Sequence, residues 1–175
     1  KTAVKSFASA VSAPAIAGTA PLTPIQCWFF REHVSDLNRF NHCVLLESRA
    51  RLEETSLRSA LQAVWNHHDA LRARYRRGEG AVVPEIAAPA RFPGFELIDL
   101  RDQTEAWQCL EAHLGTLQGK FDLQDGPLLK ATWYRLPEGD ALLLLAHHLV
   151  VDALSWRILL EDFSDGYRQA LRGQT

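Results

Sequence analysis

The segment ALLLLAHHLVVDALSW, residues 141–156, joins an apolar run to a pair of histidines and then to a helical pattern. The six apolar residues at 141–146 predict a buried strand, since an unbroken run of this length suits the interior of a sheet. Asp152 is a suitable N-cap for the helix that follows, because its carboxylate can accept a hydrogen bond from a free backbone N–H group. His147 and His148 thus lie where a buried strand gives way to a helix. An imidazole held there is accessible to a substrate and can exchange protons near neutral pH.

Strand and helix patterns alternate along the rest of the chain. Strands are predicted at 40–47, 71–77, 81–86, 128–136 and 141–147. Helices are predicted at 52–68, at 104–118 and from Asp152 to a stop at Gly173, with a further helical segment beginning at Pro24. The turn at 137–140 joins the last two strands in a hairpin. This order predicts an α/β fold, specifically a mixed-sheet α/β sandwich.

The same periodicities assign sides to individual residues. Helical spacing directs four residues of the 104–118 helix toward the core, namely Trp107, Leu110, Leu114 and Leu117. Strand alternation places three arginines on one face, namely Arg72, Arg74 and Arg76, and we expect this face to be solvated or ion-paired rather than a binding patch. A loop is expected before the 104–118 helix, in the region that contains Pro89, Pro93 and Gly94.

The chain has 175 residues, a length that predicts one domain with a substantial core. Residues 1–20 are rich in small residues and are expected to form a linker or a docked arm, with the domain itself at 21–175. The first residue is Lys1 rather than Met, so we expect the chain to be a piece of a longer polypeptide.

Composition argues against nucleic-acid and membrane partners. The chain is 47% hydrophobic and 23% charged, with a formal net charge of −2. Its longest apolar run is too short to span a bilayer. Cys27, Cys43 and Cys109 are widely spaced without a CxxC pair, which predicts reduced thiols in a cytoplasmic protein and no metal site.

Five segments occur in the order typical of epimerization domains of nonribosomal peptide synthetases, and the chain resembles that family. The segments are PLTPIQCWFF at 21–30, RFNH at 39–42, HHDALR at 67–72, FDLQDGPL at 121–128 and HHLVVDALSWRILLEDF at 147–163. The last contains the spacing HHxxxDxxSW, whose HHxxxD core is shared by the related condensation domains. Trp156 directly after Ser155, together with the PIQxWF opening, favours epimerization over condensation.

The resemblance implies a chloramphenicol-acetyltransferase-like lobe. Members of the family have two such lobes in a V, with a tunnel between them that a phosphopantetheine arm enters. The chain corresponds to the N-terminal lobe only, and the missing lobe carries a glutamate regarded as the second acid or base. We therefore expect the isolated chain to be inactive. Ala153 stands where the family usually has Gly. A methyl group at a helix start is easily accommodated, and the path of the arm is the place where an effect would be felt.

The resemblance also assigns roles within the motif. It implies a cofactor-independent epimerase that converts a carrier-bound L-aminoacyl or peptidyl thioester to its D form, with His148 exchanging the Cα proton. His147 is expected to be structural, because adjacent strand residues face opposite sides of a sheet. Asp152 is expected to hold the loop through a buried ion pair with Arg72.

Two further expectations concern the ends of helices. The positive N-terminal end of the helix near Asp152 is expected to keep the His148 imidazole neutral and to favour the enolate oxygen. Ser155 and Trp156 follow that end, and either line the tunnel or cap and pack the helix. A second histidine pair at 67–68 ends the 52–68 helix and is expected to be structural.

Two other functions remain compatible with these residues. In acyl transfer, by a condensation domain or a trimeric acetyltransferase-like enzyme, the second histidine would deprotonate an attacking amine or hydroxyl. Alternatively, the lobe is a non-catalytic docking scaffold for a carrier domain. For epimerization, the expected partners are the C-terminal lobe and an upstream peptidyl carrier domain whose phosphopantetheine holds the substrate. No intrinsic cofactor is expected.

Overall fold

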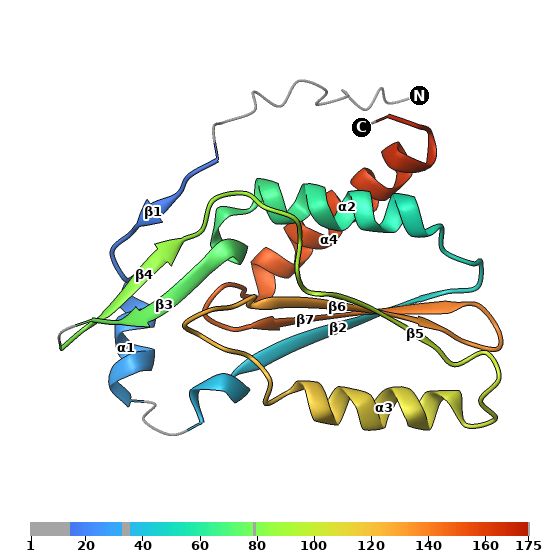
Figure 1. The fold of residues 1–175 in the computed structure, drawn as a ribbon, viewed down its shortest axis with the longest axis horizontal. Helices are drawn as coiled ribbons and strands as arrows, with labels where there is room; N and C mark the ends of the chain where they lie inside the picture. Colours follow the sequence, from blue (N-terminus) through green and yellow to red (C-terminus); the bar gives the residue numbers. More distant parts are fainter. Residues whose placement is uncertain (1–14, 33–35, 79, 175) are drawn as a thin grey trace.

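The computed structural model describes residues 15–32, 36–78 and 80–174. A four-stranded mixed sheet lies at its centre, with the strand order β2 (Asn41–Ser48), β7 (Asp140–His147), β6 (Leu129–Arg135) and β5 (Phe95–Asp99). Helices α2 (Glu54–His67) and α4 (Ala153–Leu171) cover one face of this sheet, and α3 (Ala106–Leu117) covers the other (Figure 1). The predicted mixed-sheet α/β sandwich is confirmed.

Strand β7 is the centre of the core, because every one of its residues is buried. It pairs antiparallel with β2 on one side and with β6 on the other, so none of its backbone groups lies at a sheet edge. Helices on both faces exclude water from alternate side chains, which explains why the strand is apolar throughout rather than alternating. The only polar residues of β7, Asp140 and His147, stand at its two ends.

The β6–β7 hairpin confirms the predicted turn and depends on Gly139. This residue has a φ of 76°, a conformation that residues with a Cβ rarely adopt. A Cβ at this position would also lie 2.2 Å from the backbone oxygen of Ser48. The turn therefore packs directly against the end of β2, and this close approach allows only glycine.

Asp140, the first residue of β7, joins the hairpin to the start of α2. Its side chain is fully buried, and it accepts hydrogen bonds from Arg51 Nη1 and from the backbone N–H of Leu52, each at 2.7 Å. Glu53 follows and caps α2 by accepting from the backbone N–H groups of Thr55 and Ser56. The chain is thus fixed where it passes from the sheet to its covering helix.

A smaller antiparallel sheet stands beside the main one, with the order β1 (Gly18–Thr19), β4 (Val82–Ile86) and β3 (Ala73–Arg77). Helix α1 (Pro24–Glu32) and the short 3-10 helices η1 (Leu37–Arg39) and η2 (Asp69–Arg72) connect the two sheets. Residues 1–14 of the predicted linker or docked arm lie outside the described residues. Within the described part, β1 pairs with β4.

Two predictions about the segment from Pro89 to Gln118 were wrong, one about the loop around Pro93 and one about the buried face of the following helix. The expected loop contains strand β5, which pairs in parallel with β6 and is connected to it through α3. Only five residues long and at a sheet edge, β5 carries charges that obscure its pattern. Trp107 is 45% exposed, because α3 buries the stripe formed by Ala106, Leu110 and Leu117 instead.

The structure also bears on the membrane prediction. Among the described residues, no helix combines the length and the apolar character that crossing a bilayer requires.

Substitution Asp140→Ala is expected to lower the free energy of unfolding by about 3 kcal/mol, because it leaves the Leu52 N–H and part of the Arg51 guanidinium without their buried acceptor. Urea denaturation followed by circular dichroism measures this change. Asp165→Ala is the matched control, since Asp165 pairs with Arg168 at the surface, and its effect is expected to stay within about 0.5 kcal/mol. Equal losses in the two variants would contradict this account.

Candidate active site

His147 ends β7 as a fully buried side chain with both ring nitrogens engaged. Its Nδ1 accepts a hydrogen bond from the backbone N–H of Leu149 at 3.2 Å, so this nitrogen carries no proton. Its Nε2 lies 2.7 Å from the carbonyl oxygen of Leu37, which can only accept, so Nε2 carries the proton. This imidazole is a neutral bridge between η1 and the loop after β7.

The pKa of His147 is lowered to about 4, chiefly by burial and to a smaller extent by His148, against the opposing effect of the hydrogen bond to the Leu37 carbonyl. Three aromatic rings surround the imidazole at edge-on angles, those of Phe29, Phe40 and Phe121. A proton on this ring would be poorly solvated, because its surroundings are largely apolar. His147 is therefore neutral at neutral pH.

His148 differs from its neighbour because it is only half-buried and, among the described residues, only Nδ1 of its two ring nitrogens makes a hydrogen bond. Its Nδ1 lies 2.7 Å from the carbonyl oxygen of Val151, so Nδ1 carries the proton and donates it. The neutral ring then has its unprotonated nitrogen at Nε2. A fixed tautomer of this kind gives the ring one defined proton-accepting atom.

Two aromatic side chains of the β2 segment flank His148, and sequence analysis gave neither a role. The Phe40 ring stacks on the imidazole with centroids 4.8 Å apart, and the His42 ring lies at 3.9 Å. Residues 40 and 42 share one face of the strand because side chains alternate. Burial first, and the charge of His148 second, lower the pKa of His42. Both residues belong to the RFNH segment noted in the sequence, but only the pairing of β2 with β7 shows that they lie beside His148.

The loop that carries His148 is also held from the N-terminal helix. The Gln26 side chain donates hydrogen bonds from Nε2 to the Tyr75 hydroxyl at 2.7 Å and to the Leu149 carbonyl at 3.1 Å. The Tyr75 hydroxyl donates to the same carbonyl at 3.1 Å. Burial raises the pKa of Tyr75, which keeps this hydroxyl a donor. The glutamine of the PIQ segment thus positions the loop across 123 residues of sequence.

Asp152 caps α4, as predicted, but it makes no ion pair with Arg72. Its carboxylate accepts from both the backbone N–H and the hydroxyl of Ser155, each at 2.7 Å, and these bonds lower its pKa. It is exposed, whereas the predicted ion pair was a buried one.

Arg72 is buried, so the prediction that it shares one face with Arg74 and Arg76 was wrong, although it does make an ion pair. Its guanidinium pairs with Asp69 and donates to four carbonyl oxygens, those of Ile16, Trp65, Asn66 and Ala87. These bonds use all five N–H groups of the guanidinium, and they satisfy carbonyl groups near the end of α2 and just after β4. The arginine has a structural role at the helix–strand junction.

The N-terminal end of α4 is less available than predicted. The Asp152 carboxylate accepts from the backbone N–H of Ser155, and its negative charge offsets the positive helix end. The structure therefore gives no support to stabilisation of an enolate by this helix end. Trp156 is 7% exposed and belongs to the core, which favours the packing interpretation of this residue over lining a tunnel.

Comparisons with known proteins place this site in a family context. The family model described as "Condensation domain" matches residues 16–175. Surfactin synthase subunit 2 of Bacillus subtilis (strain 168) is 42% identical over 159 residues, covering 89% of this chain and 4% of that protein. Tyrocidine synthase 1 of Brevibacillus parabrevis is 39% identical over 160 residues, covering 91% of this chain and 15% of that protein. The chain thus spans a small part of the length of these relatives.

Comparison with solved structures gives the same family of folds. The crystal structure of the epimerization domain from the third module of tyrocidine synthetase B is 39% identical with a TM-score of 0.85, covering 91% of this chain and 37% of that one. The starter condensation domain of rhizomide synthetase is 19% identical with a TM-score of 0.77, covering 90% of this chain and 39% of that one. The second likeness concerns the fold alone.

The low pKa of His147 predicts how stability depends on pH. The unfolded chain binds a proton here near the ordinary value of 6.5, whereas the folded chain does so only near 4. The unfolded chain therefore binds more protons than the folded chain in this window. As a result, the free energy of unfolding decreases by about 2 kcal/mol when the pH falls from 8 to 5. Urea denaturation across this range measures the slope. His147→Gln, which does not titrate, is expected to be less stable at pH 8 but to show a correspondingly flatter slope; parallel slopes would contradict the assignment.

Proposed function

Because the chain belongs to the condensation-domain family of nonribosomal peptide synthetases, we propose that it is the N-terminal lobe of an epimerization domain. The substrate is an L-aminoacyl or peptidyl thioester, carried on the phosphopantetheine of an upstream carrier domain. The reaction inverts Cα to give the D form. The single observation that carries this proposal is the available Nε2 of His148, on a chain that is 39% identical to a solved epimerization domain.

Inversion needs a group that removes the Cα proton and one that returns it on the opposite face. A thioester carbonyl makes this proton more acidic than an ester or amide does, so a base of neutral charge suffices and no resident cofactor is needed. The His148 Nε2 takes the proton as the C–H electron pair moves into the enolate. The resulting imidazolium keeps its second N–H on the Val151 carbonyl, which stabilises the positive charge.

The surroundings of the two histidines explain why His148, and not His147, is proposed as the base. His147 cannot accept a proton, since both its nitrogens are used and burial lowers its pKa to about 4. Phe40 and His42 cover the His148 ring without engaging its Nδ1–H. The flanking rings restrict the approach of substrate to the Nε2 side, which orients the Cα–H bond.

The second acid or base is proposed to come from the C-terminal lobe of the same domain. The chain covers 37% of the solved epimerization domain, so most of that domain lies beyond the matched region. Leu154 and Ile158 project from α4 beside the loop and are 67% and 46% exposed. Apolar side chains at this spacing on the first turns of α4 suit contact with that lobe.

Acyl transfer is the alternative that one observation supports. A neutral histidine with a free Nε2 can equally deprotonate the amine that attacks an acyl thioester, and the matching family model is named for condensation. The Ser155–Trp156 pair favours epimerization by resemblance. The two reactions differ in the proton removed, because acyl transfer leaves Cα–H bonds intact.

Deuterium uptake at Cα in heavy water distinguishes them. The measurement uses the parent enzyme with its carrier domain loaded as an aminoacyl thioester, and mass spectrometry of the released amino acid. Uptake is expected in the parent and is expected to fall at least about 100-fold in His148→Ala. His113→Ala, a half-buried histidine on α3, is the control and should retain uptake. Absence of uptake from a parent with a verified loaded carrier would overturn epimerization in favour of acyl transfer or docking alone.

Substitution Gln26→Leu is expected to slow this uptake by about tenfold, because the Leu149 carbonyl loses one of its two donors and the His148 loop shifts. The rate at saturating loaded carrier measures the effect, and circular dichroism checks the fold. Cys27→Ser alters the next residue of α1, which is exposed, and serves as the control. If both variants keep the parental rate, Gln26 has no positioning role.

A further inference from the structure

The histidine pair at the end of α2 lies apart from the site described above. His67 is the last residue of α2, and His68 is its C-cap, with φ −96° and ψ 94°. Within a helix, adjacent side chains diverge by about 100° and do not meet. The extended backbone of His68 removes this restriction, and the two imidazole rings approach edge to face with centroids 4.9 Å apart.

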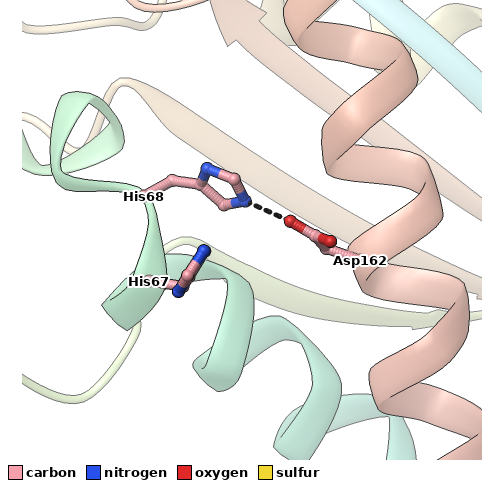
Figure 2. Close-up of side chains that lie close together, drawn as sticks. All are labelled: His67, His68 and Asp162. Atoms are coloured by element: carbon pink, nitrogen blue, oxygen red, sulfur yellow. Dashed lines mark hydrogen bonds and ion pairs between the residues drawn. The ribbon is translucent and has the colours of Figure 1, made fainter. Parts of the chain in front are cut away.

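A carboxylate from another helix completes the cluster. Asp162 lies on α4, and its Oδ2 is 2.8 Å from Nε2 of His68 (Figure 2). One potential ligand atom from each of His67, His68 and Asp162 lies within 4.8 Å of the others. The His68 and Asp162 side chains are 22% and 44% exposed, and His67 is exposed, so an ion can enter from solvent.

Two imidazoles and one carboxylate form a ligand set that zinc binds in proteins, with a fourth position left for water. Bond lengths of about 2.0–2.1 Å place tetrahedral ligands about 3.3 Å apart. The His68–Asp162 pair is already closer than this and needs only to open slightly. The distance from the His67 ring nitrogen to the other two ligand atoms shortens by rotation of the His67 side chain, which is exposed and free to change rotamer. The neighbouring carboxylate of Asp69 is engaged by Arg72 and does not compete.

We propose that His67, His68 and Asp162 form a binding site for a divalent transition-metal ion of the zinc class. The prediction of no metal site rested on cysteine spacing, and the pair at 67–68 was expected to be structural. Neither prediction included Asp162, which only the fold brings to the two histidines. Zn²⁺ bound here replaces the hydrogen between His68 and Asp162, and any proton displaced passes to solvent. The ion joins the C-terminal end of α2 to the middle of α4, and so fastens together the two helices that cover one face of the sheet. Zinc binds here whether or not the chain takes part in the reaction proposed above.

Isothermal titration of the purified chain with zinc chloride tests the site. We expect one Zn²⁺ per chain, with Kd raised at least about tenfold in His67→Gln and in Asp162→Asn. His67→Gln is the sharper variant, since His67 is exposed and the His68–Asp162 bond remains. Zinc at about 100 times the parental Kd is expected to raise the Tm of the parental chain by at least about 5 °C, and to raise that of His67→Gln by no more than about half as much.

Two controls locate the ion. His113→Gln alters a histidine with 23% exposure and a carboxylate, Glu96, at 3.7 Å, and should bind zinc as the parent does. His148→Gln tests the other imidazole cluster and should also bind normally. Loss of binding in His148→Gln with retention in His67→Gln would overturn the proposal, as would the absence of any binding heat at about millimolar zinc.

Discussion

A strand buried on both faces must satisfy its backbone where it leaves the sheet, and this constraint organises the structure. Beyond β7, the chain turns out of a water-free layer within a few residues, so its N–H and C=O groups need partners inside the protein. His147 meets this need through both ring nitrogens, and Gln26 and Tyr75 meet it at the Leu149 carbonyl. The loop is therefore rigid before any substrate is present.

Rigidity has a chemical effect, because it separates the roles of two adjacent and identical side chains. Burial holds His147 neutral while two hydrogen bonds fix its ring, whereas His148 is turned outward with Nδ1 fixed on a carbonyl. Neither state is intrinsic to histidine. The difference arises from one residue of displacement along a strand end, which reverses the direction of the side chain.

Local signals were sufficient for much of this arrangement to be predicted. The apolar run, the hairpin turn, the Asp152 cap and the stop at Gly173 each depend on a few neighbouring residues, and the structure contains all four. Contacts between distant segments were not predictable. Strand pairing brings His42 to His148, and the Gln26–Leu149 bond requires the complete fold.

Arg72 shows why pattern alone failed where it did. Alternation placed it with the arginines that follow, but the chain there is a 3-10 turn rather than a strand, so its side chain points inward. The cost of burying a guanidinium is offset by a carboxylate and four carbonyl oxygens, which come from segments that no local pattern connects. Strand β5 was missed for a related reason, since its parallel partner lies beyond α3.

The reach of the N-terminal segment into the loop matters for anyone who exchanges such lobes between synthetases. Ile16 bonds to both Asp69 and Arg72, and Gln26 bonds to the loop itself. A fusion joint placed after residue 26 would therefore replace Ile16 and Gln26, and the hydrogen bonds that they make, with residues of a foreign sequence. Grafts that preserve function should take their upstream boundary before Ile16, even though the motif that defines the site begins more than a hundred residues later.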